Sequence, residues 1–287
     1  MKIKIDALFR YPVKSMGGHR LERSHADTNG FPGDRCWAVK DETRNTFGVG
    51  KRNASIMGMQ AELQNEPTAS QPSPPVVITF ADGQQHTSSD AGIHSALSTA
   101  LGTPVSLWPL VPKEQTDHYL RQENPDSNTD PETAMRELFA RNSDEPLPDF
   151  SQFPKEIFTY ESPPGTYFDA FPLLLMSRSA LHSLQTHRAQ SQFDLRRFRP
   201  NILVDGADGG FPEDLWAGKT ARIGEATLKF EMACPRCVMT THGFDNLTRD
   251  PGIMRAIVNA NAGNLGIYAT VIEPGCISTG DTLEFLN

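Results

Sequence analysis

Residues that interrupt regular helices occur throughout this 287-residue sequence, and they constrain its fold more than any other feature. Glycine and proline occur 22 times each, so together they occupy 44 of the 287 positions. Proline has no amide hydrogen to donate inside a helix, and glycine loses more conformational freedom there than any other residue. The sequence therefore predicts many short strands joined by turns, with a few short helices, in a mainly β fold of the α+β class.

The first 112 residues predict a small β-rich domain. Short apolar or alternating runs, separated by turn residues, indicate strands at 2–11, 36–40, 57–63 and 76–80. Ile93, Leu97 and Leu101 recur every four residues, which predicts one helix in this domain. Asp90 is expected to cap its start, and Gly102 is expected to end it.

Residues 113–165 differ from the rest in composition, because polar residues and proline replace the apolar runs. We expect a connector that contributes little to the core, with a solvated acidic surface. One helix is predicted inside it, opened by Asp130 and Pro131. Its apolar side would carry Met135, Leu138 and Phe139.

Residues 166–287 predict a second β-rich domain. Strands are expected at 171–176, 201–204, 268–273 and 282–286, and a short helix at 177–186. Residues 221–232 indicate a hairpin, because Gly224 and Glu225 separate two alternating runs. Another helix is predicted to begin at Pro251, capped by Asp250, and to end at Gly263.

The charge of the chain argues against nucleic acid as a partner. There are 35 acidic and 27 basic side chains, so the net charge is −8 and a phosphate backbone would be repelled. The first eleven residues, MKIKIDALFRY, lack the apolar stretch of a signal peptide, and the longest apolar run, 171–176, is far too short to span a membrane. We therefore expect a cytoplasmic protein without a membrane segment.

Four cysteines, too few for a disulfide scaffold, are expected to be free thiols in a reducing compartment: Cys36, Cys234, Cys237 and Cys276. Their spacing matches neither ferredoxin pattern, which excludes an iron–sulfur cluster held by this chain. If the protein carries out redox chemistry, its electrons must come from another chain.

Reactive groups are densest at residues 232–241, MACPRCVMTT. Cys234 and Cys237 with Arg236 between them are compatible with a redox disulfide, half of a metal site, or one thiolate activated by a cation. They are also compatible with two inert, small apolar residues at a strand end. His242 is the only further zinc ligand nearby in the sequence, whereas a structural zinc site usually needs four ligands.

Basic residues next to turns and strand ends form a second group of candidates. They are Lys14 in YPVKS, Arg35 in GDRCW, Lys51 and Arg52 in GKR, and Arg196, Arg197 and Arg199 in RRFRPN. Guanidinium groups bind phosphate through two hydrogen bonds and lysine adds a point charge, so together these residues could hold a small anionic cofactor. Each one alone is more often a solvated surface residue. No glycine-rich nucleotide-binding motif accompanies them.

Five segments, in this order, resemble the MOSC-domain proteins that carry an N-terminal β-barrel (MOSC_N) domain. They are LFRYPVKSMGG, GDRCW at 33–37, FRPNILVDG at 198–206, MACPRCVMTT at 232–241 and NLGIYATVIEPGCISTGDTLEFL at the end. The chain is similar in these motifs to the mitochondrial amidoxime-reducing component and its bacterial relatives. The resemblance implies an N-terminal β-barrel-like domain at 1–112, a connector at 113–165 and a MOSC β-barrel domain at 166–287.

The resemblance also implies a molybdenum cofactor, in which the dithiolene sulfurs of a molybdopterin and one protein cysteinate hold the metal. By position in the motif, Cys237 is the metal ligand and catalytic residue, while Cys234 packs. Thiolate suits a metal that already has sulfur ligands, and we expect neighbouring Arg236 to lower the pKa of Cys237. The cofactor contacts carried over from the motifs are Lys14, Ser15, Arg35, Arg199, Asn201 and Arg236.

The activity implied is reduction of N-hydroxylated compounds, such as amidoximes and hydroxylamines, with electrons from a separate ferredoxin-type or flavin-type reductase. An alternative is a carrier that delivers molybdenum cofactor or sulfur, using a persulfide on Cys237 or Cys234. A third reading is a relative that no longer binds cofactor, in which Lys14, Arg35 and Arg199 would lie on opposite faces.

Three features depart from the pattern of the family. Ala170 and Phe171 stand where mitochondrial relatives carry a hydroxyl-bearing pair, so that contact with the cofactor must be lost or replaced. Pro235 replaces a polar residue of the cysteine motif and removes a backbone donor. Some bacterial relatives carry a C-terminal ferredoxin domain, whereas this sequence ends at residue 287, which again predicts an external electron donor.

Overall fold

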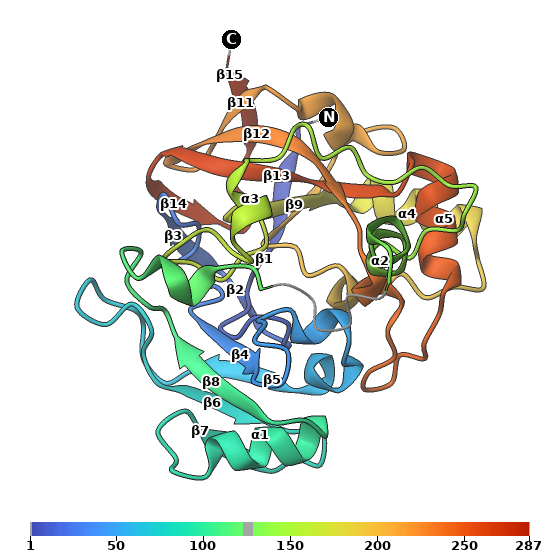
Figure 1. The fold of residues 1–287 in the computed structure, drawn as a ribbon. Coiled ribbons are helices and arrows are strands. Elements are labelled where there is room, and N and C mark those ends of the chain that lie inside the picture. The colour runs from blue at the N-terminus through green and yellow to red at the C-terminus, as the bar shows by residue number, and fades with distance from the viewer. Residues whose placement is uncertain (1, 123–128, 287) are drawn as a thin grey trace.

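A computed structural model describes residues 2–122 and 129–286, and it confirms a mainly β fold with short helices (Figure 1). The helices of the described residues are α1 (Ile93–Leu101), α2 (Pro131–Leu138), α3 (Glu156–Thr159), α4 (Arg178–His187) and α5 (Gly252–Asn261). None of them is long and apolar enough to cross a membrane. Residues 123–128 of the predicted connector lie outside the described part.

The largest sheet has eight strands and draws on both ends of the chain. Its order is β15 (Leu283–Leu286), β11 (Thr220–Ile223), β12 (Ala226–Pro235), β13 (Asn264–Glu273), β9 (Leu173–Ser177), β10 (Ile202–Asp205), β1 (Lys4–Arg10) and β2 (His19–Leu21). All neighbours are antiparallel except β9 and β10, which are parallel and joined through α4. The N-terminal strand β1 pairs with β10, with Leu8 opposite Ile202.

Three smaller sheets complete the strands of the described residues. One pairs β3 (Arg23–Ala26) with β14 (Gly275–Ser278), one pairs β4 (Trp37–Asp41) with β8 (Val105–Pro109), and one contains β5 (Gln60–Leu63), β6 (Val76–Thr79) and β7 (Gln85–Thr87). Because β1 and β2 belong to the large sheet and β3 pairs with β14, the N-terminal segment is in strand contact with the C-terminal one. The predicted domain limits at 112 and 165 stay a prediction.

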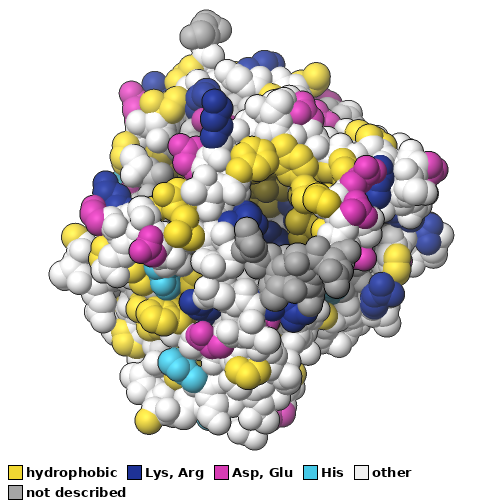
Figure 2. Space-filling model, in the orientation of Figure 1, with side chains coloured by type: hydrophobic (Ala, Val, Ile, Leu, Met, Phe, Trp, Pro, Cys, Tyr) yellow, Lys and Arg dark blue, Asp and Glu magenta, His cyan; other side chains and the backbone are white. Residues whose placement is uncertain are grey.

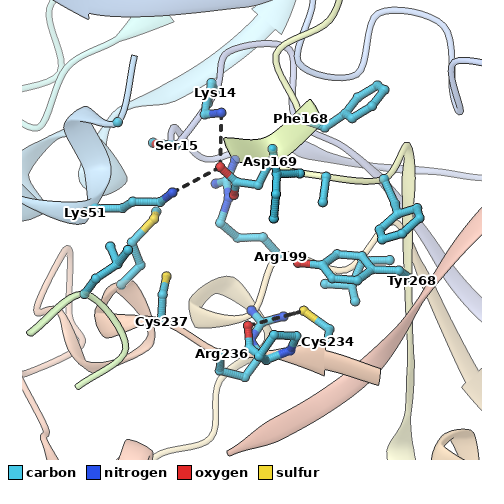
Figure 3. A pocket seen from close by; sticks show the side chains of 18 of the residues that line it. Lys14, Ser15, Lys51, Phe168, Asp169, Arg199, Cys234, Arg236, Cys237 and Tyr268 are labelled. Carbon is cyan, nitrogen blue, oxygen red and sulfur yellow. Dashed lines mark hydrogen bonds and ion pairs between the residues drawn. The ribbon is translucent and has the colours of Figure 1, made fainter. Parts of the chain in front are cut away.

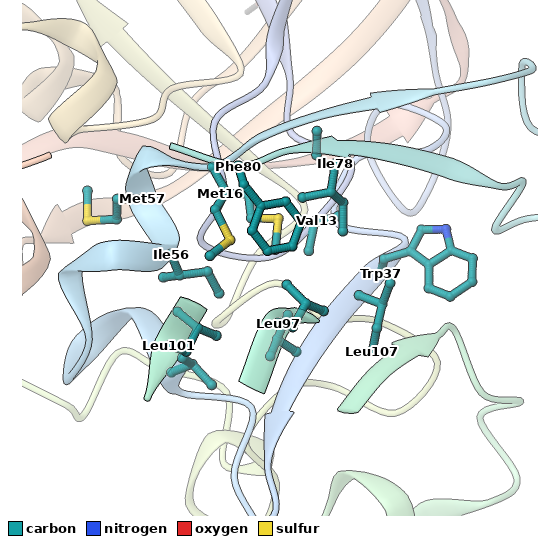
Figure 4. Packing of buried hydrophobic residues seen from close by; sticks show 14 of the residues in the cluster. Val13, Met16, Trp37, Ile56, Met57, Ile78, Phe80, Leu97, Leu101 and Leu107 are labelled. Carbon is teal, nitrogen blue, oxygen red and sulfur yellow. The ribbon is translucent and has the colours of Figure 1, made fainter. Parts of the chain in front are cut away.

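Separate hydrophobic cores lie on the two sides of the molecule. Under β4 to β8, residues such as Val13, Ile78 and Leu97 pack together and close the space between helix α1 and the small sheets (Figure 4). The inner face of the large sheet has its own core, which includes Leu175 and Phe230. A further apolar layer packs α4 and α5 against that sheet. The segments that carry the polar candidates adjoin these cores, since Val13 and Met16 flank Lys14 and Ser15, and Phe198 and Ile202 flank the stretch that holds Arg199 and Asn201.

The local sequence signals succeed at the hairpin and at most helix ends. Ile223 pairs with Ala226 across the predicted turn, where Gly224 has a φ of 58°. Asp130 caps α2, as predicted, by accepting hydrogen bonds from two amides of the first turn. The prediction that Asp90 caps α1 is wrong, because its carboxylate accepts from the amide and hydroxyl of Thr87 instead. Asp90 therefore stabilises the preceding turn.

Candidate functional site

One cavity of about 370 Å³ brings together residues from segments that are far apart in the sequence (Figure 3). Every candidate that the family motifs suggested lines it: Lys14, Ser15, Arg35, Arg199, Asn201, Arg236 and Cys237. Lys14, Arg35 and Arg199 therefore share one site, which is the opposite of the scatter expected from a relative without a cofactor site. Their roles toward a cofactor stay predictions.

Backbone strain marks three of these residues. Ser15, Arg35 and Arg199 have φ values of 71°, 49° and 57°, in the left-handed region that residues with a Cβ seldom occupy. Such a conformation costs roughly 1–3 kcal/mol and persists where the surrounding structure enforces it, most often at functional sites. The fold therefore imposes an unfavourable backbone conformation at three of the seven candidates, which come from three separate loops.

Asp34 is the hydrogen-bonding centre beneath the basic residues, and sequence analysis did not single it out. Its buried carboxylate accepts from the amide of Tyr11 at 2.8 Å and from Nδ2 of Asn201 at 3.0 Å, and it pairs with the Arg35 guanidinium. The guanidinium of Arg199 lies over the ring of Tyr11, 4.3 Å from its centroid. Asp34 and Tyr11 thus fix the direction of both arginines and of Asn201.

Arg199 supplies an unused donor. Its Nη1 donates to the carbonyl of Met16, but its buried Nη2 has no hydrogen-bond partner among the described residues. Burial, and next the charge of Arg35, lower the pKa of Arg199 to about 10, so that it remains a cation at neutral pH. A buried donor without a partner is costly, and an anion in the cavity would relieve that cost. The donor set therefore fits a group that carries phosphate.

Asp169 is a second residue that sequence analysis missed. Its carboxylate is 3.1 Å from Nζ of Lys14 and 3.4 Å from Nζ of Lys51 (Figure 3). Loss of water opposes its ionisation, but the charges of Lys14 and Lys51 hold the pKa of this carboxyl well below its ordinary value. Asp169 thus stays charged and holds the two ammonium groups at the cavity. No pattern around it in the sequence indicated this.

The two cysteines of the motif differ in their surroundings. Cys234 is buried, and its Sγ accepts from Nη1 of Arg236 at 3.2 Å, while Nη2 of Arg236 donates to the carbonyl of Phe198. Cys237 is only half-buried, lines the cavity and precedes a 3-10 turn at Val238–Thr241. In the described residues, no three histidine, cysteine or acidic side chains are placed to hold a metal ion by themselves.

Arg236 lowers the pKa of Cys237, as expected, but its effect is too small to decide the net shift, which is upward. Burial raises the pKa of the Cys237 thiol, and the opposing effect of Lys51 exceeds that of Arg236. The guanidinium of Arg236 donates a hydrogen bond to Cys234, so it acts on Cys237 through its charge alone. The nearest cations thus reduce the cost of a thiolate at Cys237 without abolishing it.

Arg197 has a structural role rather than an anion-binding one. Its guanidinium donates to the carbonyls of Gln192, Thr240, His242 and Thr248, at 3.1, 3.3, 2.6 and 2.7 Å. The sequence grouped this residue with Arg199 because both are basic residues of one motif. Arg197 and Arg199 differ in their contacts with other segments. The guanidinium of Arg197 binds carbonyls of the loop after Cys237 and so holds that loop in place.

We predict that Cys36 is unreactive in the folded protein. Burial raises the pKa of its thiol to about 12. The fold thus favours the neutral thiol, and at pH 8 the thiolate fraction falls about 1,000-fold below that of an exposed cysteine. Labelling with an alkylating agent, followed by peptide mass spectrometry, should modify half-exposed Cys276 and spare Cys36 until urea unfolds the chain. Equal labelling of both in the native state would contradict this.

Two protein-family models match this chain. The MOSC domain matches residues 163–284, and the MOSC N-terminal beta barrel domain matches residues 2–98. The chain is a MOSC-domain protein. All seven candidates of this MOSC protein fall within the two matched regions.

The curated relatives match over shorter segments. Mitochondrial amidoxime reducing component 2 from Homo sapiens is 44% identical over 75 residues, which is 26% of this chain and 21% of that protein. Mitochondrial amidoxime-reducing component 1 from Xenopus laevis is 40% identical over 128 residues, covering 40% of this chain and 36% of that protein. The match thus spans between about a fifth and a third of these relatives.

Solved structures resemble the MOSC protein more distantly. The YuaD protein from Bacillus subtilis aligns over 99% of this chain and 96% of its own, with 14% identity and a TM-score of 0.44. YiiM from Escherichia coli aligns over 41% of this chain and 55% of its own, with 20% identity and a TM-score of 0.32.

Proposed function

We propose that this MOSC protein binds a molybdenum cofactor and reduces N-hydroxylated compounds such as amidoximes and hydroxylamines. The observation that carries the proposal is the convergence of Cys237 and the basic candidates on one cavity. The names of the curated relatives support the reductase activity. Electrons would come from a separate ferredoxin-type or flavin-type reductase, and the cytoplasmic location stays a prediction.

Each residue of the site would have a distinct task. Arg35, Lys14 and the unpaired Nη2 of Arg199 would bind the phosphate of the molybdopterin, and Ser15 and Asn201 would add hydrogen bonds. The cofactor, when bound, supplies the two-electron chemistry at its metal. Cys237, the half-buried cysteine of the motif that lines the cavity, would complete the coordination of that metal.

The charge around Cys237 would help it to ligate. The thiol must lose its proton to bind a metal, and burial opposes that loss. Lys51 favours the thiolate most among the nearby cations, while its contact with Asp169 keeps its ammonium group beside the cavity. Asp169 thus acts on Cys237 in two opposing ways: it positions Lys51, which lowers the pKa of the thiol, while its own negative charge raises that pKa.

The direct test is metal and pterin analysis of the purified protein, combined with an amidoxime reduction assay driven by a chemical electron donor. We expect about one molybdenum per chain and the fluorescence of oxidised pterin after acid release, with reduction that requires the metal. Bound pterin without any reduction would reject the reductase proposal. An added sulfur on Cys237 or Cys234, seen by mass spectrometry after incubation with a sulfur donor, would instead favour a carrier.

A further inference from the structure

The cavity has two sides of opposite chemistry. Its basic side contains Lys14, Arg35, Lys51, Arg199 and Arg236. The other side, which we call the aromatic wall, contains Phe139, Phe150, Phe153, Phe158, Phe171 and Tyr268. Figure 2 shows a hollow rimmed by hydrophobic side chains, with Lys and Arg side chains at its floor. Such a cavity can bind an anionic ligand at its basic side and, next to it, a second ligand with an apolar group at the aromatic wall.

The aromatic wall is a continuous series of ring contacts. Phe139 and Phe150 have centroids 5.5 Å apart, Phe150 and Phe153 are 5.7 Å apart, and Phe153 and Tyr268 are 6.5 Å apart. Phe171 extends the series at 5.1 Å from Tyr268. These separations are typical of interacting rings. The wall therefore joins the predicted connector to strand β13 of the large sheet.

These rings are not part of a hydrophobic core. None of the six belongs to the four core clusters of the described residues. Phe139 directly follows α2 and Phe158 lies on α3, and neither helix buries a residue. Phe158 is 61% exposed. Single exposed apolar side chains are common on proteins, whereas a contiguous set that borders a cavity is typical of a ligand site.

Tyr268 connects the two sides of the cavity. Its ring is the meeting point of Phe153 and Phe171, and its hydroxyl points into the cavity (Figure 3). Cys234 and Arg236, which come from the adjacent strand β12 and the residue after it, line the same region. A ligand that contacts the aromatic wall would therefore also reach the cysteine motif.

On the basis of the proposed function, we propose that the aromatic wall holds the apolar body of the substrate. The site then takes N-hydroxylated compounds that carry an aromatic ring, in preference to those that carry a small alkyl group. A flat ring gains both apolar burial and favourable ring geometry against Phe153 and its neighbours. A methyl group is too small to cover more than one of these rings. The connector, which supplies four of the six rings of the wall, is thus the main specificity-determining segment.

The test compares a phenyl-substituted and a methyl-substituted amidoxime on the protein with its cofactor bound. In Phe153→Ala we expect the preference for the phenyl compound, measured as the ratio of the two KM values, to fall about tenfold. Phe153→Leu keeps an apolar side chain and should retain part of that preference. Leu215→Ala removes an apolar side chain that is 75% exposed and does not line the cavity, so it should keep the full preference.

A second readout does not depend on turnover. Without an electron donor, calorimetry should give a Kd for the phenyl amidoxime that rises about tenfold in Phe153→Ala and is unchanged in Leu215→Ala. Unchanged KM ratios and Kd values in Phe153→Ala would overturn the role of the wall while leaving the reductase proposal intact. Binding that depends on Phe153, without reduction of either compound, would support the wall and reject the reductase.

Discussion

Replacement of Cys237 by alanine should lower the molybdenum content of the purified protein and the rate of amidoxime reduction by at least about 100-fold. Loss of a residue that merely supports a ligand typically costs 10- to 100-fold in metal affinity or activity, so loss of the ligand itself should cost more. Cys237 lines the cavity and is only half-buried, which leaves its sulfur accessible to a bound group. Elemental analysis and a reduction assay measure the two effects separately.

Two other cysteines make this test specific. Cys276 lies on strand β14 and does not line the cavity, so Cys276→Ala should retain both molybdenum and activity. Cys234→Ala distinguishes the two thiols of the motif, since Cys234 is buried beside Arg236. If Cys234→Ala lost the metal while Cys237→Ala kept it, the ligand would be Cys234 and the assignment of Cys237 would be wrong.

Arg197→Ala is expected to reduce the free energy of unfolding by about 3–5 kcal/mol. The Arg197 side chain is among the largest fully buried ones, and its guanidinium donates to four backbone carbonyls. Removing it leaves those carbonyls without their charged donor and opens a void. Urea unfolding of the variant and the natural sequence, followed by circular dichroism, measures the difference.

Arg196 provides the matched control for that variant. It is the adjacent residue, but its side chain is 43% exposed and pairs with Asp194 and Asp245. Exposed ion pairs contribute little, so Arg196→Ala should change the free energy of unfolding by less than about 1 kcal/mol. Arg197→Met keeps much of the volume without any donor and should lose almost as much as alanine. Similar values for Arg196→Ala and Arg197→Ala would refute the structural role of Arg197.

Local signals in the sequence account well for the secondary structure. The hairpin around Gly224, the cap at Asp130 and the helix near Pro251 depend on neighbouring residues, and the structure has all three. Asp90 shows the limit of such signals. A carboxylate just before a helix can accept from the amides of its first turn, whereas that of Asp90 accepts from Thr87 of the preceding turn. A helix cap and a bond back to Thr87 use the same carboxylate, so the sequence around Asp90 does not decide between them.

The candidate site was only partly predictable. Family motifs pointed to residues that the structure does bring together, such as Lys14 and Arg199, although neither is near the other in the sequence. Asp169 and Asp34 escaped notice because a single carboxylate has no distinguishing pattern until its partners are known. Arg197 and Arg199 looked alike for the same reason. Their difference depends on which groups from distant segments surround each guanidinium.

The aromatic wall shows how composition can mislead. Residues 113–165 are rich in polar residues and proline, which predicted a segment with little core. That expectation agrees with helices α2 and α3, which bury no residue, but Tyr119 of the same segment belongs to a small core with Phe47 and Tyr167. The phenylalanines of this segment are also gathered at the cavity, so a small share in the core did not mean a lack of organised apolar surface. Periodic apolar patterns arise where one face of a helix or strand packs against a core. Side chains on loops that border a cavity need no such pattern.

The position of strand β1 affects how the chain can acquire its fold as it leaves the ribosome. β1 is made first, but its partner β10 follows it by almost 200 residues. During synthesis β1 has only β2 as an available neighbour, so the large sheet cannot close until most of the protein has emerged. The loop that bears Lys14 and Ser15 directly follows β1, whereas Arg199 and Asn201 directly precede β10. The same late event that completes the sheet therefore brings the two parts of the basic side of the cavity together.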